Sequence, residues 1–234
     1  MKKKKIYIVT GSRADYGLLS NLITQLRKSK KLEITIVVTG QHLSKKYGNT
    51  YKEVKKDFHK PIKFIDIKVN NSDINSILKS ISIGITKVGK YFISKKPDLL
   101  ILLGDRYEML SIAVAALFNK VTIAHIHGGE LTQGSIDDTI RHTISKFSNL
   151  HFVATAQYKK RIIQLGENPD KVFLVGGLGS ENIKNINYLD KKYLEKDLKI
   201  KFKKNNFLIT FNSFLDNKVS VKTATRNMLK ALKK

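Results

Sequence analysis

The sequence contains no cysteine and no tryptophan, and it has only three prolines among its 234 residues. Without cysteine the chain has neither disulfides nor thiolate metal sites. Its six histidines are scattered and show no HExxH or similar ligand spacing, so we expect no metal and no cofactor. It also lacks any run of about 18 apolar residues, the length that a transmembrane helix needs. These absences exclude disulfide-rich domains, cysteine-based metal sites and helical membrane proteins.

The amino terminus reads MKKKKIYIVTG, a basic start followed by an apolar run of only five residues. A signal peptide carries a longer apolar region, of about 7–15 residues. Because the run leads straight into a glycine, we interpret it as a first β-strand. We expect a cytoplasmic protein with no membrane partner.

Positive charge is in large excess, with 44 Lys and Arg against 19 Asp and Glu and a net charge of +25. Such an excess ordinarily indicates nucleic acid or acidic membranes as partners. Here the lysines are spread along the whole chain among many Ile and Asn, which is typical of a genome-wide bias, and arginines are few. We therefore expect no nucleic-acid partner, with polyanion binding as the alternative. An anionic small substrate would suit the charge equally well.

Short β-branched runs alternate with longer amphipathic segments, which is typical of a parallel sheet with helices on both faces. The predicted fold class is α/β and Rossmann-like. The expected strands are residues 6–10, 33–39, 64–67, 99–104, 122–127, 150–155, 172–177 and 207–211. The expected helices are residues 16–30, 43–57, 73–94, 106–118, 138–148, 156–165 and 218–233.

A domain boundary is expected around residues 185–205, where the sequence becomes polar and lysine-rich. Residues 1–184 form the predicted Rossmann-like domain. Beyond the boundary only one predicted strand and one predicted helix follow, and a single βα unit cannot cover a sheet of its own. Residues 185–234 are therefore expected to be a linker and the incomplete start of a second domain.

Polar residues follow the first two predicted strands, and ligands of open α/β sheets bind beyond the carboxyl ends of strands. In GSRADYG, Asp15 can cap the next helix and Arg13 lies where a helix N-terminus favours an anion. In TGQHLSKKYG, Gln41 and His42 come at the same edge. The simpler alternative is that these are capping and surface residues.

The motif LLGDRYEM places an acid directly after the fourth predicted strand. Asp105 is either the N-cap of the next helix or a group that faces the crevice. Arg106 and Glu108 belong to the first turn of that helix and are expected to be structural partners.

The stretch HIHGGELTQGSIDDTIRH, residues 125–142, follows the fifth apolar run. His125 and His127 are two residues apart, so on a strand they point to the same side. The glycine-bounded loop then leads into a helix whose N-cap is Ser135 or Asp137.

That helix carries two pairs four residues apart, Asp137 with Arg141 and Asp138 with His142. Two surface pairs would contribute only about 0.3–0.5 kcal/mol each. The alternative is a general acid/base site, because acids and histidines gather at the ends of three predicted strands. The glycine-rich VGGLGSENI fits neither a P-loop nor GxGxxG and is a weak signal by itself.

Five motifs together resemble the hydrolysing UDP-N-acetylglucosamine 2-epimerases of sialic acid and legionaminic acid biosynthesis. They are GSRADYGLL, TGQHLSKKYGNTYKE, PDLLILLGDRYEML, HIHGGELTQGSIDDTIRHTISKFSNLHF and VFLVGGLGSENI, in the family's order. The resemblance implies a GT-B architecture of two Rossmann-like domains, with UDP held mostly by the second. It also implies a reaction without metal or redox cofactor, in which UDP is eliminated across C1–C2 and water is then added with inversion at C2.

The resemblance also implies site residues, carried over by position. The residues expected to be catalytic are Asp105, His127, Glu130, Asp137 and Arg141. Relatives often have a glutamate where His127 stands, so Glu130 is expected to supply that carboxylate with His127 beside it. The residues expected to bind substrate are Arg13, near the diphosphate, with Gln41, His42 and His125. Which acid removes the C2 proton is left open.

The sequence departs from the family at its C-terminal end. Relatives are longer, and they tend to read TFHP where this chain reads TFNSF, which places Asn212 and Ser213 at the usual His-Pro. We expect the N-terminal part of an epimerase, nearly inactive alone because binding energy from UDP helps to position the sugar. The alternative is a non-catalytic half of a split enzyme. UDP-N-acetylglucosamine and UDP-N,N'-diacetylbacillosamine both remain possible substrates, and the family tends to form homo-oligomers.

Overall fold

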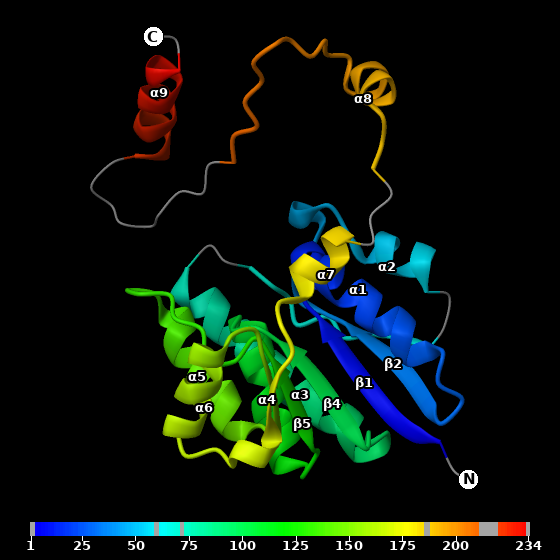
Figure 1. Ribbon diagram of the computed structural model, residues 1–234. Helices are drawn as coiled ribbons and strands as arrows, with labels where there is room; N and C mark the ends of the chain where they lie inside the picture. Colours follow the sequence, from blue (N-terminus) through cyan, green and yellow to red (C-terminus); the bar gives the residue numbers. More distant parts are fainter. Residues whose placement is uncertain (1–2, 59–60, 71–72, 185–187, 211–219, 233–234) are drawn as a thin grey trace. The chain divides into compact units, whose positions relative to one another are not determined.

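A computed structural model describes residues 3–58, 61–70, 73–184, 188–210 and 220–232 (Figure 1). The chain divides into two compact units, Met1–Ile186 and Asn187–Lys234. Asn212 and Ser213 lie outside the described residues. The first unit contains the whole sheet and all of the sequence-predicted site residues.

The sheet has seven parallel strands in the order β3-β2-β1-β4-β5-β6-β7. Their bounds are Lys4–Thr10 (β1), Leu32–Val38 (β2), Ile62–Phe64 (β3), Leu99–Leu103 (β4), Ile123–Ile126 (β5), Leu150–Val153 (β6) and Val172–Leu174 (β7). The strand order reverses between β1 and β4, which are hydrogen-bonded neighbours. Such a reversal opens a crevice at the carboxyl ends of the strands, where α/β proteins bind ligands.

Helices connect successive strands and cover both faces of the sheet (Figure 1). In the first unit they are Arg13–Arg27 (α1), Tyr51–Asp57 (α2), Ile74–Ser94 (α3), Tyr107–Phe118 (α4), Ile136–Phe147 (α5), Ala156–Gln164 (α6) and Leu178–Lys184 (α7). Three short 3₁₀ turns are Gly40–Leu43 (η1), Lys45–Tyr47 (η2) and Pro169–Lys171 (η3). The second unit contains Lys191–Leu198 (α8) and Val221–Ala231 (α9).

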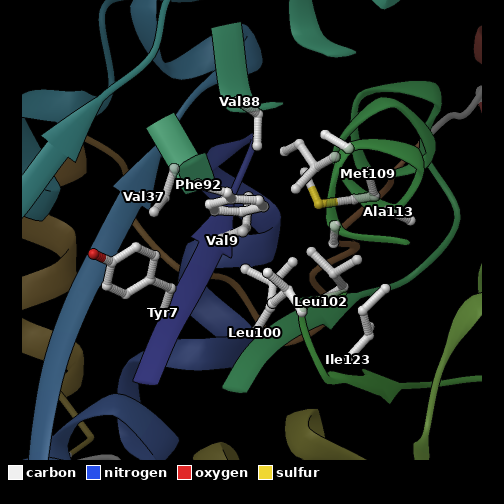
Figure 2. Close-up of a cluster of buried hydrophobic side chains, with 14 of the residues drawn as sticks. Tyr7, Val9, Val37, Val88, Phe92, Leu100, Leu102, Met109, Ala113 and Ile123 are labelled. Atoms are coloured by element: carbon white, nitrogen blue, oxygen red, sulfur yellow. The ribbon is translucent and has the colours of Figure 1, made fainter. Parts of the chain in front are cut away.

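The alternation of side chains along the strands supplies two large cores, one on each face of the sheet, beside a small third cluster of Val153, Ile162 and Val172. From β1, Tyr7 and Val9 enter one core, whereas Ile6 and Ile8 enter the other. The first core is completed by α3 and α4, with Phe92 and Met109 among its members, as Figure 2 shows. The second core is completed by α1 and α2. The apolar-on-both-faces pattern of the strands therefore reflects burial on both sides.

Several expectations about elements differ from the structure. The helix expected over 43–57 is broken into η1, η2 and α2, because Gly48 adopts a left-handed conformation with φ of 84° and ends η2. The strand expected at 64–67 shares only Phe64 with β3, which runs from Ile62 to Phe64. Helices α7 and α8 were not expected from the sequence.

The strand expected at 207–211 is not present over its described part, 207–210, which has no regular structure. A strand needs a neighbouring strand for its main-chain hydrogen bonds. Within the described residues of the second unit, the elements are helices. Among all the residues that the structure describes, no helix is both long and apolar enough to cross a membrane.

Candidate active site

Asp105 lies just beyond β4 and turns toward α5. The strand ends at Leu103, and Gly104 reverses the chain with φ of 76°, a conformation that glycine adopts without strain. The N-cap of α4 is Arg106, so Asp105 is not the cap. Its Oδ2 accepts a hydrogen bond from Nη2 of Arg141. Of the two alternatives for Asp105, the structure supports the one in which it faces the crevice.

Arg141 is the centre of the site, with a side chain that is only 5% exposed. Besides Asp105, its Nη2 donates to Oγ1 of Thr132 at 3.1 Å. Its Nη1 donates to Oδ1 of Asp138 at 2.9 Å and to the carbonyl of Glu130 at 2.8 Å. The planar guanidinium thus ties the end of β4, the loop after β5 and α5 together.

The acid paired with Arg141 on α5 is Asp138, not the expected Asp137. Asp138 is three residues before Arg141, and its Oδ1 also accepts from the main-chain N–H of Thr132 at 2.7 Å. Asp137 instead accepts from the hydroxyl of Ser135 at 2.8 Å. Ser135 is the N-cap of the helix, as one of the two alternatives predicted. Burial raises the pKa of Asp105, and the charge of Asp137 adds to this rise.

His127 and Glu130 form a second pair in the same loop, with Nδ1 and Oε1 2.9 Å apart. His127 follows β5 and has a φ of 64°, which is not a strand conformation. The expectation that His125 and His127 point to the same side of a strand therefore does not apply. Its Nε2 accepts a long contact, 3.5 Å, from the main-chain N–H of Leu178. Because an amide N–H only donates, a neutral His127 in this arrangement carries its proton on Nδ1 and donates it to Glu130.

The two carboxyls of the site have pKa values displaced in opposite directions. Burial raises the pKa of Asp105 above its ordinary value, and the opposing effect of Arg141 does not cancel it. The hydrogen bond from His127 lowers the pKa of Glu130, helped by the charge of Arg141. Asp105 therefore holds a proton more readily, while Glu130 is kept ionised.

His125 is fully buried, and its role in binding substrate stays a prediction. Its Nε2 is 2.8 Å from the carbonyl of Gly104, and its Nδ1 is 3.0 Å from Oγ of Ser145. Burial lowers its pKa to about 4, so the imidazole is neutral near pH 7. The residue holds the turn that carries Asp105.

His42 is likewise enclosed. Its Nε2 lies 2.9 Å from Oγ1 of Thr10 and its Nδ1 lies 2.8 Å from Oγ1 of Thr50. Burial lowers its pKa to about 4. The neutral imidazole of His42 joins the end of β1 to the start of α2, and its role in binding substrate stays a prediction. Gln41, beside it in η1, is half-buried.

Arg13 is the first residue of α1 and is exposed, with Nε 3.2 Å from Oε2 of Glu53. The N-cap of α1 is Ser12, not Asp15. Asp15 accepts instead from the main-chain N–H of Gly11 at 3.2 Å, and burial raises its pKa. Because β1 and β4 are neighbours, this turn lies at the same edge of the sheet as Asp105.

Arg106 and Glu108 are structural partners, as expected. Two nitrogens of the guanidinium contact the two carboxylate oxygens at 3.2 and 2.8 Å, and Glu108 is fully buried. Among the residues that the structure describes, no group of three or more metal-ligating side chains is present.

Comparison with known proteins identifies the family of the chain. The model of one protein family, described as UDP-N-acetylglucosamine 2-epimerase, matches residues 24–234. The chain belongs to this family. The GDP/UDP-N,N'-diacetylbacillosamine 2-epimerase (hydrolyzing) of Campylobacter jejuni serotype O:2 is 46% identical over 99% of this chain and 60% of its own length. The UDP-N,N'-diacetylbacillosamine 2-epimerase (hydrolyzing) of Legionella pneumophila is 41% identical over 77% of this chain and 48% of its own length.

Solved structures of the same family share the fold. A UDP-GlcNAc 2-epimerase from Neisseria meningitidis bound to UDP-GlcNAc matches with a TM-score of 0.68 and 21% identity, over 83% of this chain and 53% of that one. A putative UDP-N-acetylglucosamine 2-epimerase from Listeria monocytogenes matches with a TM-score of 0.71 and 18% identity, over 85% and 52%. This epimerase-family chain therefore spans about half the length of most of these proteins, and the matched part is the Rossmann-like half of a GT-B fold.

Sequence reasoning missed three residues of this epimerase-family site. Asp138 was paired with His142, although its three-residue spacing to Arg141 was a usable signal. Thr132, which bonds Arg141, lies in a loop without periodicity. Arg161 donates to the carbonyl of Gly129 from a helix 32 residues away, and no local pattern indicates this contact.

Proposed function

We propose that this chain carries the carboxylate-bearing side of a hydrolysing UDP-sugar 2-epimerase site. The observation that carries the proposal is that Arg141 holds both the carboxylate of Asp105 and the main-chain carbonyl of Glu130, with the two carboxyl pKa values displaced in opposite directions. Separated pKa values are what a site needs when one group takes a proton and another stays ionised. Family membership supplies the class of substrate, a nucleotide sugar.

In the first half of the proposed reaction, Asp105 removes the proton from C2 of the sugar. The electron pair of the C2–H bond forms the C1=C2 bond, the C1–O bond breaks, and UDP leaves with that electron pair. A carboxylate with a raised pKa is the stronger base of the two, so Asp105 suits this role. Arg141 holds Asp105 and opposes the charge of the site as UDP departs.

In the second half, water adds to the 2-acetamidoglucal that the elimination leaves. The hydroxyl of the water bonds to C1, and the electron pair of the C1=C2 bond takes a solvent-derived proton at C2 on the face opposite Asp105, which inverts the configuration there. Asp105 then releases the proton that it removed to solvent. Glu130 remains ionised and is oriented by His127, so it can accept the proton that the attacking water loses. The charge of Asp137 adds to the effect of burial in raising the pKa of Asp105, which keeps Asp105 the stronger base.

The edge of the sheet that Arg13 occupies is proposed to contribute to holding the nucleotide. Arg13 stands at the start of α1, a 15-residue helix whose N-terminus favours an anion. Because the chain covers only part of its relatives, we propose that it turns over poorly alone. Of the two possible substrates, the higher identity to diacetylbacillosamine epimerases favours UDP-N,N'-diacetylbacillosamine.

The test uses a chimera, because the chain is proposed to lack part of the nucleotide site. This chain is continued with the part of the Campylobacter jejuni relative that lies beyond the match, and UDP release is measured with both substrates. Asp105→Asn should lower kcat by about 10²-fold or more, the scale of a lost general base. Asp170→Asn, the same change at an exposed acid of η3, should leave kcat unchanged.

Two outcomes would overturn the proposal. The first is a folded chimera that releases no UDP under conditions in which the intact relative does. The second is a chimera whose kcat is the same with and without the Asp105→Asn change.

A further inference from the structure

The loop that carries Glu130 is held at two consecutive main-chain carbonyls by two different arginines. Nη1 of Arg141, from α5, donates to the carbonyl of Glu130 at 2.8 Å. Nη1 of Arg161, from α6, donates to the carbonyl of Gly129. Each carbonyl thus receives a charge-assisted hydrogen bond, which is stronger than one between neutral groups.

At Gly128 and Gly129 the main chain of this loop lies directly against α5 and α6, and a side chain would not fit at either position. A Cβ on Gly129 would come within 2.6 Å of the carbonyl oxygen of Tyr158 in α6, and φ at Gly129 is 78°. A Cβ on Gly128 would come within 2.9 Å of Oγ of Ser145 in α5. The position of the loop is therefore set by backbone contact with α5 and α6, and polar groups of those helices decide where its carbonyls point.

Arg161 is well placed to fix the loop because its own helix is anchored. Thr155 caps α6 by accepting from the N–H of Tyr158 at 3.3 Å. Ile162, the next residue after Arg161, is fully buried and belongs to the small core between α6 and β7. The guanidinium of Arg161 also lies over the ring of Tyr158, with Cζ 5.8 Å from the ring centroid.

We propose that Arg161 is a positioning residue for the epimerase site: by holding the carbonyl of Gly129, it keeps the Glu130 carboxylate on His127. Arg161 affects Glu130 through the peptide unit that joins Gly129 to Glu130. What this positioning achieves in catalysis rests on the proposed function, whereas the positioning itself does not.

Loss of the Arg161 contact should change the pKa of Glu130. If the Arg161 contact is removed, the peptide after Gly129 is free to turn and the hydrogen bond from His127 to Glu130 weakens. That hydrogen bond is the main reason why the pKa of Glu130 is low. The pKa should then rise toward the ordinary value of 4.5. The titratable and charged groups around Glu130 are His127, Arg141, His125 and Asp105.

The test is a ¹³C NMR titration of the glutamate side-chain carboxyls in the 234-residue chain, with Glu130→Gln used to assign the signal. Arg161→Met removes the donor and keeps an apolar side chain of similar length. Lys160→Met is the matched control, since it removes one positive charge from the neighbouring, exposed position of the same helix. We expect a raised Glu130 pKa in Arg161→Met and the wild-type value in Lys160→Met. Millimolar guanidinium, but not sodium at equal ionic strength, should restore the low pKa in Arg161→Met.

Two results would overturn the proposal: an unchanged Glu130 pKa in folded Arg161→Met, or equal shifts in Arg161→Met and Lys160→Met. If Arg161→Met does not fold, Arg161→Gln, which keeps an N–H donor, carries the same test with a smaller expected shift. A wild-type Glu130 that titrates in the ordinary range would overturn the pairing with His127 and the proposal with it. The NMR result is independent of turnover, so failure of the chimera assay would count against the proposed function alone.

Discussion

Asp105 and Glu130 carry the same chemical group in one site, yet their surroundings drive their pKa values apart. Burial raises the pKa of Asp105, and this effect is larger than the lowering that the guanidinium of Arg141 causes. Glu130 is also partly buried, but the N–H of His127 stabilises its ionised form. The sequence identified both residues and left their roles open, because burial and hydrogen bonding are properties of the folded chain.

The buried histidines were the least predictable residues. His42 and His125 both follow or end strands, which is also where catalytic histidines occur. Whether such a side chain turns inward depends on distant partners, here Thr50 for His42 and Ser145 for His125. A pattern of neighbouring residues cannot report on contacts of this kind.

At the residue scale, His42 should make the stability of the protein depend on pH. Its pKa is about 4 in the folded state and 6.5 ordinarily, so between these values the unfolded chain binds more protons. The free energy of unfolding should therefore fall as the pH falls from 6.5 to 4, with a contribution from His42 of the order of 2–3 kcal/mol.

The measurement is urea denaturation of the wild type and of His42→Gln between pH 7 and pH 4. The difference between the two proteins isolates the contribution of His42, because Asp105 and Asp15 are present in both. The raised pKa values of these two acids stabilise the folded state as the pH falls, which is opposite to the effect of His42. A constant difference across this range would contradict a neutral, buried His42.

At the scale of elements, the strands were largely predictable and their connections were not. The apolar runs that gave β1, β2, β4, β5 and β6 are buried on both faces, and such runs are visible in the sequence. The segment after β2 was misread because its helical spacing of apolar residues continues across Gly48, where the backbone turns left-handed. The loop after β5 is defined by contacts with α5 and α6, which no local pattern encodes.

Two glycines of that loop provide a matched test of how it is held. Gly129 and Gly134 have nearly the same φ, 78° and 77°, but only Gly129 lies against α6. Gly134→Ala should cost about 1 kcal/mol, the strain of a left-handed alanine. Gly129→Ala should cost about 1–3 kcal/mol more, because its Cβ would meet the carbonyl oxygen of Tyr158. Equal urea midpoints for the two variants would contradict the packing of the loop on α6.

At the scale of the whole molecule, the first unit contains its own core. The members of the three buried apolar clusters all lie between residues 6 and 178. We therefore predict that residues 1–186 fold alone with one cooperative transition. The check is urea denaturation of that fragment followed by circular dichroism and tyrosine fluorescence. A fragment without a cooperative transition, or with transitions that differ between the two probes, would show that the core needs residues 187–234.

We propose above that side chains of this chain take part in removing and replacing the C2 proton of a UDP-sugar. The most direct measurement is proton NMR of the chimera with substrate in deuterated water, with Asp105→Asn as its control. We expect free UDP and a mannose-configured product that carries deuterium at C2, with both lost in Asp105→Asn. A product that keeps its original proton at C2 would contradict elimination and addition at this site.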